Sequence, residues 1–174
     1  MSKPPVDPRG RIGPAAGAAG SRWFVLVLWL VLCVGGGAFV GLLTSGGTDP
    51  WYLALRKPVF NPPSWVFGPV WTGLYTLMAI AAWRVWLRGG WAAQRVPLTF
   101  FALQLAANFA WSFLFFRAQL IDLALVDIVF LWLMILLTTR QFAPVDRPAA
   151  WLLAPYLAWV SFALALNLGF AILN

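Results

Sequence analysis

The sequence contains no histidine and no glutamate, and its single cysteine is Cys33 among 174 residues. Without histidine, the chain cannot build a Ser-His-Asp triad, an HExxH zinc site or a His-ligated haem. A lone cysteine also excludes an intrachain disulfide and a thiolate metal cluster. Charge is scarce, because only 10% of the residues are charged, whereas a typical soluble domain carries about 25%. This composition excludes an ordinary soluble enzyme.

Apolar residues make up 62% of the chain and are concentrated in five long runs. Each run holds about 20 residues or more, enough to cross roughly 30 Å of hydrocarbon as an α-helix. Backbone groups in lipid must be hydrogen-bonded within the protein, which favours helices for runs of this length. The sequence therefore predicts an all-α integral membrane protein, a five-transmembrane-helix bundle formed by residues 23–174. The predicted helices are 23–43, 66–87, 96–116, 120–139 and 149–173.

Two segments lie outside these runs. Residues 1–22 are rich in Gly, Pro and Ala and include four basic residues, so we expect a disordered basic tail. Residues 44–64 form a long first loop, stiffened by prolines that keep it out of a helix. Because the Trp and Phe side chains of this region would be costly to expose to water, we expect the loop to fold over the bundle as a lid.

The formal net charge of +7 raises the question of a nucleic-acid partner. The basic residues, however, are scattered singly between apolar runs, and this pattern is typical of topogenic charge. Nine of the 12 Lys and Arg lie at span ends or in segments on the same side of the membrane as the N-terminus. The other three, Arg56, Lys57 and Arg117, lie on the opposite side. We therefore expect no nucleic-acid partner, a cytoplasmic N-terminus and an outward-facing first loop.

Tryptophan is unusually frequent, with 12 residues. Four lie at the ends of predicted spans and fit interfacial anchors. These are Trp23, Trp86, Trp91 and Trp151. Four others, Trp71, Trp111, Trp132 and Trp159, lie within the spans. Either helix packing or the wall of a cavity for a flat aromatic ligand explains an indole at this depth, and the spacing alone leaves both interpretations open.

On three predicted helices, three side chains at helical spacing share one face, and at least two of the three are polar or aromatic. The three sets are Trp71, Tyr75 and Met78; Gln104, Asn108 and Trp111; and Trp159, Ala163 and Asn167. Carboxamides are costly against lipid, so Gln104 and Asn108 should face the bundle. They would serve there either as hydrogen-bond partners between helices or as contacts to a bound ligand.

Two further features within the spans have alternative interpretations. Asp127 is a candidate for a proton relay, but no His, Glu or Lys lies within the spans to complete one. A structural, hydrogen-bonded carboxylate is therefore favoured. Gly37 and Gly41 allow a close backbone approach, which suits either packing within the chain or a dimer interface.

The chain resembles the TspO/MBR family of tryptophan-rich sensory proteins and translocator proteins. Four motifs over about residues 36–174 carry the resemblance: WYLALRKPVFNPPSWVFGPVWTGLY from Trp51, QLAANFAWSFLFF from Gln104, ALVD from Ala124 and PYLAWVSFALALN from Pro155. The resemblance implies a five-helix bundle, usually dimeric, in a bacterial cytoplasmic membrane. It also implies a pocket near the first loop that binds porphyrins and, in some members, sterols or synthetic aromatic drugs.

The resemblance assigns ligand binding to residues of the spans and of the loop. They are Trp71, Asn108, Trp159, Ala163 and Leu166, with Trp51 and Trp65 in the loop, and the helix faces add Tyr75 and Trp111. The expected function is that of a membrane porphyrin-binding sensor linked to tetrapyrrole and stress metabolism. The alternatives are light-dependent breakdown of protoporphyrin, with Trp71 and Trp159 as candidate photochemical residues, and transport of porphyrins or sterols.

Several expectations concern the ligand. We expect no obligatory cofactor and no metal site, with protoporphyrin IX or haem bound as the ligand. Because the chain has no histidine and Cys33 lies far from the motifs, we expect little preference for haem over metal-free protoporphyrin. The stretch after Asn167 contains neither the Tyr nor the basic residue of the family's cholesterol motif, which argues against sterol binding by that route. No conventional catalytic residue is predicted.

Overall fold

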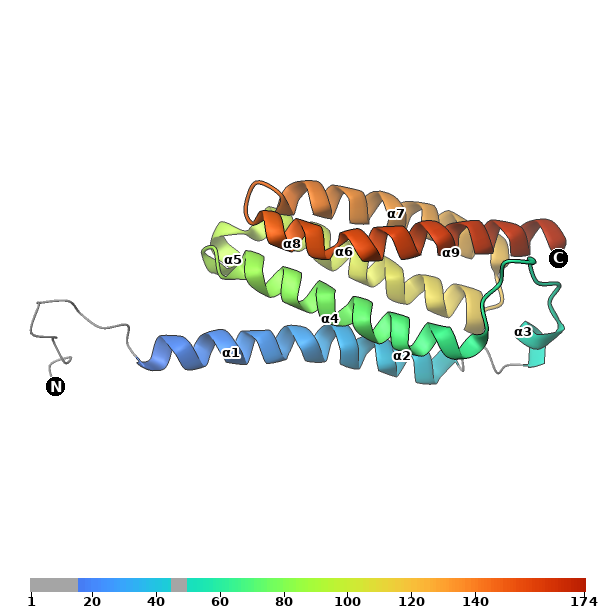
Figure 1. Ribbon diagram of the computed structural model, residues 1–174, viewed down its shortest axis with the longest axis horizontal. Helices are drawn as coiled ribbons and strands as arrows, with labels where there is room; N and C mark the ends of the chain where they lie inside the picture. Colours follow the sequence, from blue (N-terminus) through green and yellow to red (C-terminus); the bar gives the residue numbers. More distant parts are fainter. Residues whose placement is uncertain (1–15, 45–49) are drawn as a thin grey trace, which may run out of the picture.

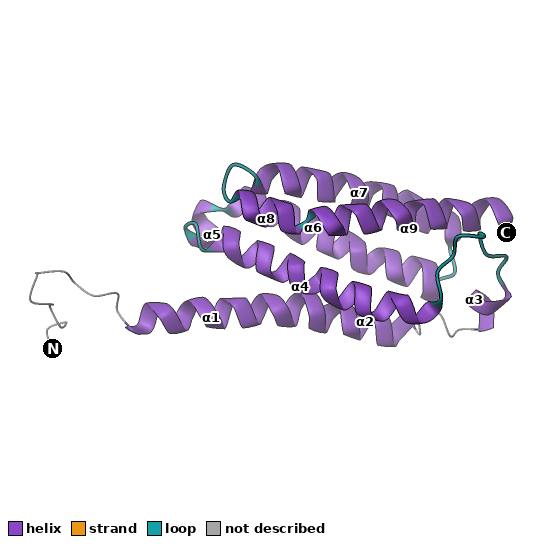
Figure 2. Cartoon of the chain, in the orientation of Figure 1, coloured by secondary structure: helices purple, strands orange, loops and turns teal. Residues whose placement is uncertain are grey.

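The computed structural model describes residues 16–44 and 50–174, with side chains from residue 22 onward. In these two ranges the chain is helical and contains no β-strand (Figure 2). Five of the described helices are long and apolar enough to cross a membrane, which confirms the predicted five-helix class and makes the chain an integral, multi-pass membrane protein. The spans are Arg22–Thr44, Ser64–Trp86, Arg95–Arg117, Ile121–Phe142 and Arg147–Leu173.

Most of the spans are assembled from consecutive helical segments that lie along one common long axis (Figure 1). The first comprises α1 (Ala16–Leu30), the π-helix η1 (Val31–Gly35) and α2 (Gly36–Thr44). The second comprises η2 (Ser64–Val66) and α4 (Phe67–Trp86), and the third α6 (Arg95–Ser112) and the π-helix η3 (Phe113–Arg117). The fourth is α7 (Ile121–Phe142), and the fifth comprises α8 (Arg147–Leu152) and α9 (Ala154–Leu173). Short helices α3 (Pro50–Ala54) and α5 (Gly90–Ala93) lie in the connections.

Helical structure extends into both segments that were predicted to lie outside the helices. α1 begins at Ala16, within the predicted tail of residues 1–22, and residues 1–15 lie outside the described part. In the first loop, prolines 58, 62 and 63 do keep residues 55–63 non-helical, but Pro50 opens the short helix α3. Proline suits this position because the first helical N–H has no partner within the helix. Residues 45–49 also lie outside the described part.

The core lies between α4, α6, α7 and the two helices of the fifth span. Fully buried side chains from all of these elements meet there, among them Met78, Phe101, Leu131 and Tyr156. Many apolar side chains point outward instead, for example Leu42, which is 81% exposed. Lipid is the solvent for this surface, so the exposed leucines, valines and phenylalanines need no protein partner.

Proline and aspartate shape the fifth span. α8 ends at Leu152, and α9 restarts at Ala154 with Pro155 in its first turn, because proline has no N–H to continue the ladder. Asp146 is the N-cap of α8, and its carboxylate accepts a hydrogen bond from the Ala149 N–H at 3.0 Å.

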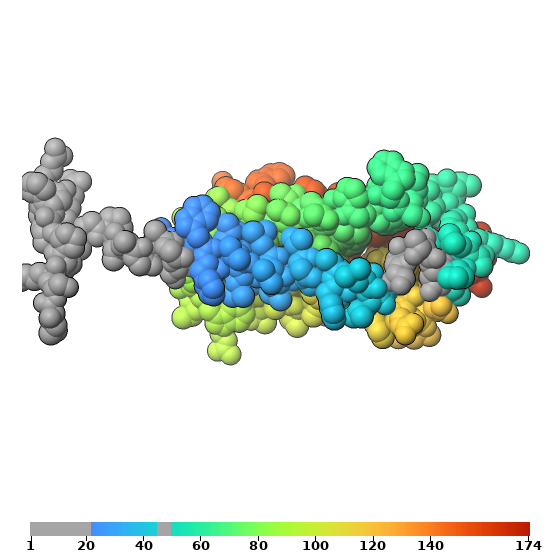
Figure 3. Space-filling view, turned by 90° about the horizontal axis from the view of Figure 1, so that it is seen from below, coloured from blue at the N-terminus to red at the C-terminus, as the bar shows by residue number. Residues whose placement is uncertain are grey.

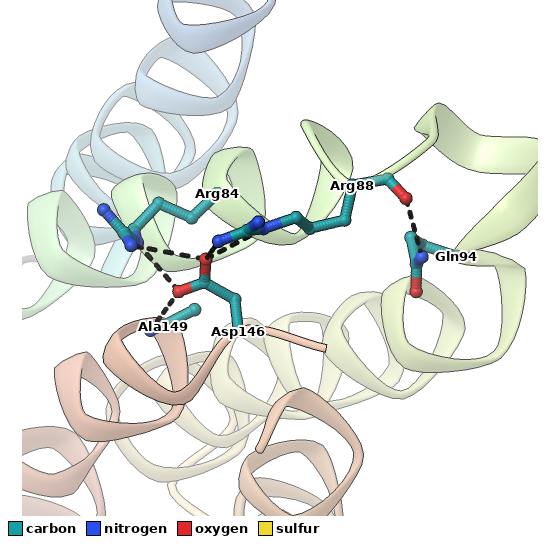
Figure 4. A network of polar contacts seen from close by, with 5 residues as sticks. All are labelled: Arg84, Arg88, Gln94, Asp146 and Ala149. Atoms are coloured by element: carbon teal, nitrogen blue, oxygen red, sulfur yellow. Dashed lines mark hydrogen bonds and ion pairs between the residues drawn. The ribbon is translucent and has the colours of Figure 1, made fainter. Parts of the chain in front are cut away.

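The same carboxylate joins the fifth span to α4 and to the turn after it (Figure 4). This contact lies at the end of the bundle away from the first loop (Figure 1). The Nε of Arg84 donates to Asp146 Oδ1 at 3.0 Å, and Nη2 of Arg88 donates to Oδ2 at 2.7 Å. Burial alone would raise the pKa of Asp146, but the hydrogen bonds from Arg88, Arg84 and Ala149 outweigh it and hold that pKa below its usual value. An ionic contact therefore fixes α4 against α8.

Candidate functional site

A cavity of about 280 Å³ lies at the loop end of the bundle. Its walls come from η1, α2 and α3, from α4, and from the end of the third span. In the space-filling view, the surface is hollowed between the end of α2 and the start of α4, beside the first loop (Figure 3). The lining residues are Val34, Gly37, Ala38, Gly41, Thr44, Tyr52, Phe67, Gly68, Trp71, Thr72, Tyr75, Trp111, Ser112 and Phe116. Three predicted site residues, Trp71, Tyr75 and Trp111, are among them.

Aromatic rings form much of this wall. Trp71 stacks on Tyr75, one helical turn later on α4, with ring centroids 5.4 Å apart and an interplanar angle of 30°. Trp111 stacks on Phe115 at 5.5 Å, and Phe115 meets Phe116 edge to face at 4.9 Å. The cavity therefore presents indole, phenol and phenyl faces from two different spans.

Gly37 permits the position of the Tyr75 ring. A Cβ at Gly37 would overlap this ring, so only glycine lets α2 lie directly against it. The contact shows that Gly37 serves packing within the chain, one of the two alternatives weighed from the sequence. Gly41 differs, because a Cβ there would meet no atom within 4 Å; Gly41 lines the cavity instead.

Asn108 lies behind the aromatic wall and is not one of the lining residues. It is fully buried, and its Oδ1 accepts a hydrogen bond from the Tyr75 hydroxyl. In the part of the chain that the structure describes, its Nδ2 has no partner, and neither polar atom of the buried Gln104 side chain has one. The prediction that both carboxamides face the bundle is confirmed, and one of them orients a cavity tyrosine.

Among the described residues, Asp127 does not find the hydrogen-bond partner that the sequence interpretation favoured. It is half-buried on α7, and its Oδ2 is shielded from solvent without a partner. Trp132 fits the packing interpretation, because its indole N–H donates to Ser161 Oγ between α7 and α9 at 2.9 Å.

A second, much smaller cavity of about 20 Å³ adjoins the first. Tyr52, Phe67, Trp111 and Phe116 line both. The predicted site residues Ala163 and Leu166 line this smaller one together with Asn61, Phe115, Asn167 and Phe170. The volume is close to that of a single water-sized probe, about 10–15 Å³. Ala163 and Leu166 thus lie one aromatic layer away from the main cavity.

A hydrogen-bonded pair holds this layer in place. The Trp111 indole N–H donates to Asn167 Oδ1 at 2.9 Å, and Asn167 Nδ2 donates to the Ile121 carbonyl at 3.1 Å. These bonds connect α6, α9 and the start of α7. Trp111 therefore combines the two roles that the sequence left open, because it packs the helices and also lines the cavity.

Trp159 lines neither cavity. It packs edge to face on Phe67, with centroids 6.0 Å apart, and its buried indole N–H has no partner. Trp71, Asn108 and Trp159 consequently do not line one common cavity in this structure. Phe67, which Trp159 contacts, lines both cavities.

The two loop tryptophans also occupy different environments. Trp51 is half-buried and meets Phe115 edge to face at 6.0 Å, whereas Trp65 is 75% exposed. The sequence analysis missed Tyr52, a buried neighbour of Trp51 that lines both cavities and donates from its hydroxyl to Asn61 Oδ1 at 3.3 Å. Consecutive residues of a helix point in different directions, so Tyr52 lines the cavities although its neighbour Trp51 does not.

The fold and the cavity define a class: a multi-pass helical membrane protein with an aromatic-walled cavity beneath its first loop. The chain belongs to the TspO/MBR family, whose model matches residues 29–173.

Named relatives from bacteria and animals agree with this membership. The chain is 45% identical over 154 residues to "Tryptophan-rich protein TspO" of Chlorobaculum tepidum, covering 85% of this chain and 97% of the relative. It is 41% identical over 134 residues to "Translocator protein" of Bos taurus, covering 75% and 79%. It is 40% identical over 146 residues to "Tryptophan-rich sensory protein" of Cereibacter sphaeroides, covering 83% and 88%. The family and these names support a sensory or transport role in the membrane.

Proposed function

We propose that this protein binds protoporphyrin-type tetrapyrroles in the cavity beneath its first loop and acts as a membrane sensor of them, linked to tetrapyrrole and stress metabolism. The observation that carries the proposal is the aromatic wall, in which Trp71 stacks on Tyr75 at the cavity surface. Flat π-systems suit such a wall, because an aromatic pair contributes about 0.5–1.5 kcal/mol beyond the area that it buries.

The size of the cavity indicates how a tetrapyrrole would bind. Its volume of about 280 Å³ is near the lower end of the roughly 300–1,000 Å³ that is usual for small-molecule sites. A macrocycle would be only partly enclosed, with one edge projecting toward Tyr52 and Phe116 at the loop end. Nine of the 12 basic residues lie on the side of the membrane opposite to the cavity opening. We therefore propose that the N-terminus lies in the cytoplasm and that the cavity opens outside.

The side chains around the cavity suit contacts with the porphyrin ring rather than coordination of a haem iron. No Cys or Met is among the lining residues described, which leaves the phenols of Tyr52 and Tyr75 as candidate iron ligands. Burial raises the pKa of Tyr52, more than its hydrogen bond to Asn61 lowers it, which disfavours the phenolate that binds haem iron. We therefore expect similar affinities for haem and metal-free protoporphyrin.

The proposal is tested by titrating the purified protein in detergent with protoporphyrin IX and following the Soret band. This readout does not depend on the number of indoles in the protein. Trp71→Ala should weaken binding about tenfold, which corresponds to about 1.4 kcal/mol. Trp151→Ala is the matched control, because Trp151 is 76% exposed on α8 and lines neither cavity.

Two results would contradict the proposal. One is an unchanged Soret band at micromolar protoporphyrin with the wild-type protein. The other is equal loss of affinity in Trp71→Ala and Trp151→Ala, which would indicate non-specific partitioning into the detergent shell. Trp71→Phe separates stacking from folding, since it keeps an aromatic ring and should retain most of the affinity.

A second candidate function is light-dependent breakdown of the bound porphyrin, with a cavity indole as electron donor to the photoexcited ring. The contact of Trp71 with Tyr75 favours it, because stacked rings offer a short route for the electron. Illuminated samples should then lose porphyrin absorbance faster than dark ones. Trp71→Phe should slow this loss more than Trp159→Phe, since Trp71 lines the main cavity and Trp159 lines neither cavity. Equal rates in all three proteins would exclude these roles.

A further inference from the structure

Among the described residues, the cations at the loop end of the bundle have no anionic partner. Arg56, Lys57 and Arg117 lie at this end, and both ion pairs found among the described residues involve Asp146 at the other end. Asp122, in the first turn of α7, contacts none of the three within ion-pair distance. Positive charge beside an apolar cavity is therefore available to a ligand.

Lys57 differs from the two arginines because the loop holds its ammonium group in a defined place. The Nζ donates to the Leu53 carbonyl at 3.0 Å and to the Leu55 carbonyl at 3.4 Å. It also lies 5.2 Å from the centre of the Tyr52 ring, within cation–π range. The side chain is half-buried, whereas Arg56 and Arg117 are exposed.

The contacts of this ammonium leave it able to bind one more acceptor. A lysine ammonium has three N–H donors, and two of them are directed at carbonyl oxygens. Tyr52, the ring beneath it, lines both cavities. Lys57 thus places a positive charge next to a wall that is otherwise aromatic and aliphatic.

We propose that Lys57 is a specificity-determining residue that pairs with a carboxylate at the edge of the ligand, so that the site selects anionic tetrapyrroles over neutral ones. This inference rests on the proposed function and names the class of porphyrin that the site takes. Protoporphyrin carries two propionate side chains on one edge of its ring. With the macrocycle against Trp71 and Tyr75, that edge would project toward Tyr52, where the Lys57 ammonium lies.

The test compares two ligands that share a ring but differ in charge: protoporphyrin IX and its dimethyl ester. Each is titrated by its Soret band into wild type, Lys57→Met, Lys57→Arg and Arg56→Met in the same detergent. Methionine keeps most of the apolar stem and removes the charge. Arg56→Met is the matched control, because it removes a neighbouring cation whose side chain is exposed. The two hydrogen bonds between Arg56 and Asn174 involve the Arg56 backbone, so the substitution leaves them in place.

We expect the wild type to bind the diacid about fivefold more tightly than the diester, the effect of one partly exposed ion pair. Lys57→Met should abolish this preference by weakening the diacid alone. Lys57→Arg and Arg56→Met should retain it.

Each other outcome overturns the inference in a distinguishable way. If Lys57→Met weakens both ligands equally, the residue only supports the loop. If Arg56→Met loses the preference as fully as Lys57→Met does, the selection comes from diffuse charge. If the wild type binds the two ligands equally, the charge is not recognised although the porphyrin site stands; if it binds neither, the proposed function itself is wrong.

Discussion

Replacing Asp146 with asparagine tests how the fifth span is held against α4. The Asp146 side chain is 2% exposed, whereas those of Arg84 and Arg88 are 34% and 56% exposed. Asparagine keeps an oxygen that can accept the Ala149 N–H and removes only the charge. The substitution therefore separates the ion pairs from the helix cap, and Asp146→Ala removes both.

The magnitude follows from the exposure of the partners. Hydrogen bonds to charged groups contribute about 1.5–3 kcal/mol when buried, and exposed ion pairs about 0–1 kcal/mol. Because one partner is buried and the others reach water, we expect Asp146→Asn to lower the free energy of unfolding by about 1–2 kcal/mol. Asp146→Ala should cost about 1 kcal/mol more, the usual contribution of an N-cap.

The effect should depend on pH with a definite sign. The pKa of Asp146 lies below its usual value in the folded protein, so its stabilisation is fully present above the unfolded pKa of about 3.9. It is lost as pH falls through the folded pKa. Wild type and Asp146→Asn should therefore differ at neutral pH and converge well below pH ~4.

Cys33 provides the assay. It is the chain's single cysteine and is fully buried, so the rate of its modification by a maleimide reports how often the bundle opens. A loss of about 1–2 kcal/mol raises the open population about five- to thirtyfold. Since maleimide needs the thiolate and therefore loses reactivity in acid, thermal denaturation gives the comparison at low pH.

Asp122→Asn is the matched control, because Asp122 is exposed in the first turn of α7 and makes no ion pair among the described residues. It should change stability by only about 0.3 kcal/mol, through the helix dipole. Equal labelling rates in Asp146→Asn and Asp122→Asn at neutral pH would refute the reasoning. So would a difference in stability that persists undiminished in acid.

Two further predictions concern the loop end. Gly37→Ala should displace the Tyr75 ring and destabilise the protein by about 1–3 kcal/mol through overpacking, which lowers the melting temperature in detergent. Gly73→Ala is the control, because a Cβ there meets no atom within 4 Å, and it should be neutral or stabilising. Equal losses of stability in the two variants would contradict this prediction. Asn174→Ala removes two hydrogen bonds to the Arg56 backbone, of 2.9 and 3.1 Å, and should speed amide exchange in that loop. Unchanged exchange would show that other contacts hold it.

The spans were predictable because the bilayer itself sets their length. An apolar run must cover about 30 Å, so composition alone locates each helix. Composition does not locate the breaks within a span. The π-helices η1 and η3 interrupt the first and third spans where they flank the cavity, and such bulges depend on packing against neighbours rather than on residue type. The break between α8 and α9 differs, because Pro155 itself lacks the N–H donor.

Spacing along one helix predicted part of the cavity wall. Trp71 and Tyr75 are one turn apart on α4, so their spacing placed them on the same face. Trp159 belongs to another span, and its relation to Trp71 depends on which side chain fills the space between the helices. Trp159 contacts Phe67 and lines neither cavity, and no spacing rule reports this.

Substitutions that lower stability and substitutions that weaken ligand binding should have separate effects, because the two sets of contacts lie at opposite ends of α4. Arg84, in the last turn of α4, and Arg88, in the turn that follows, hold the fifth span, while Trp71 nearer the N-terminal end of α4 lines the cavity. Changes more than about 10 Å apart that share no partners usually add independently. Asp146→Asn should therefore lower stability and leave porphyrin affinity unchanged. A parallel loss of affinity would show that α4 moves as one rigid element, so that the ionic end also sets the shape of the cavity.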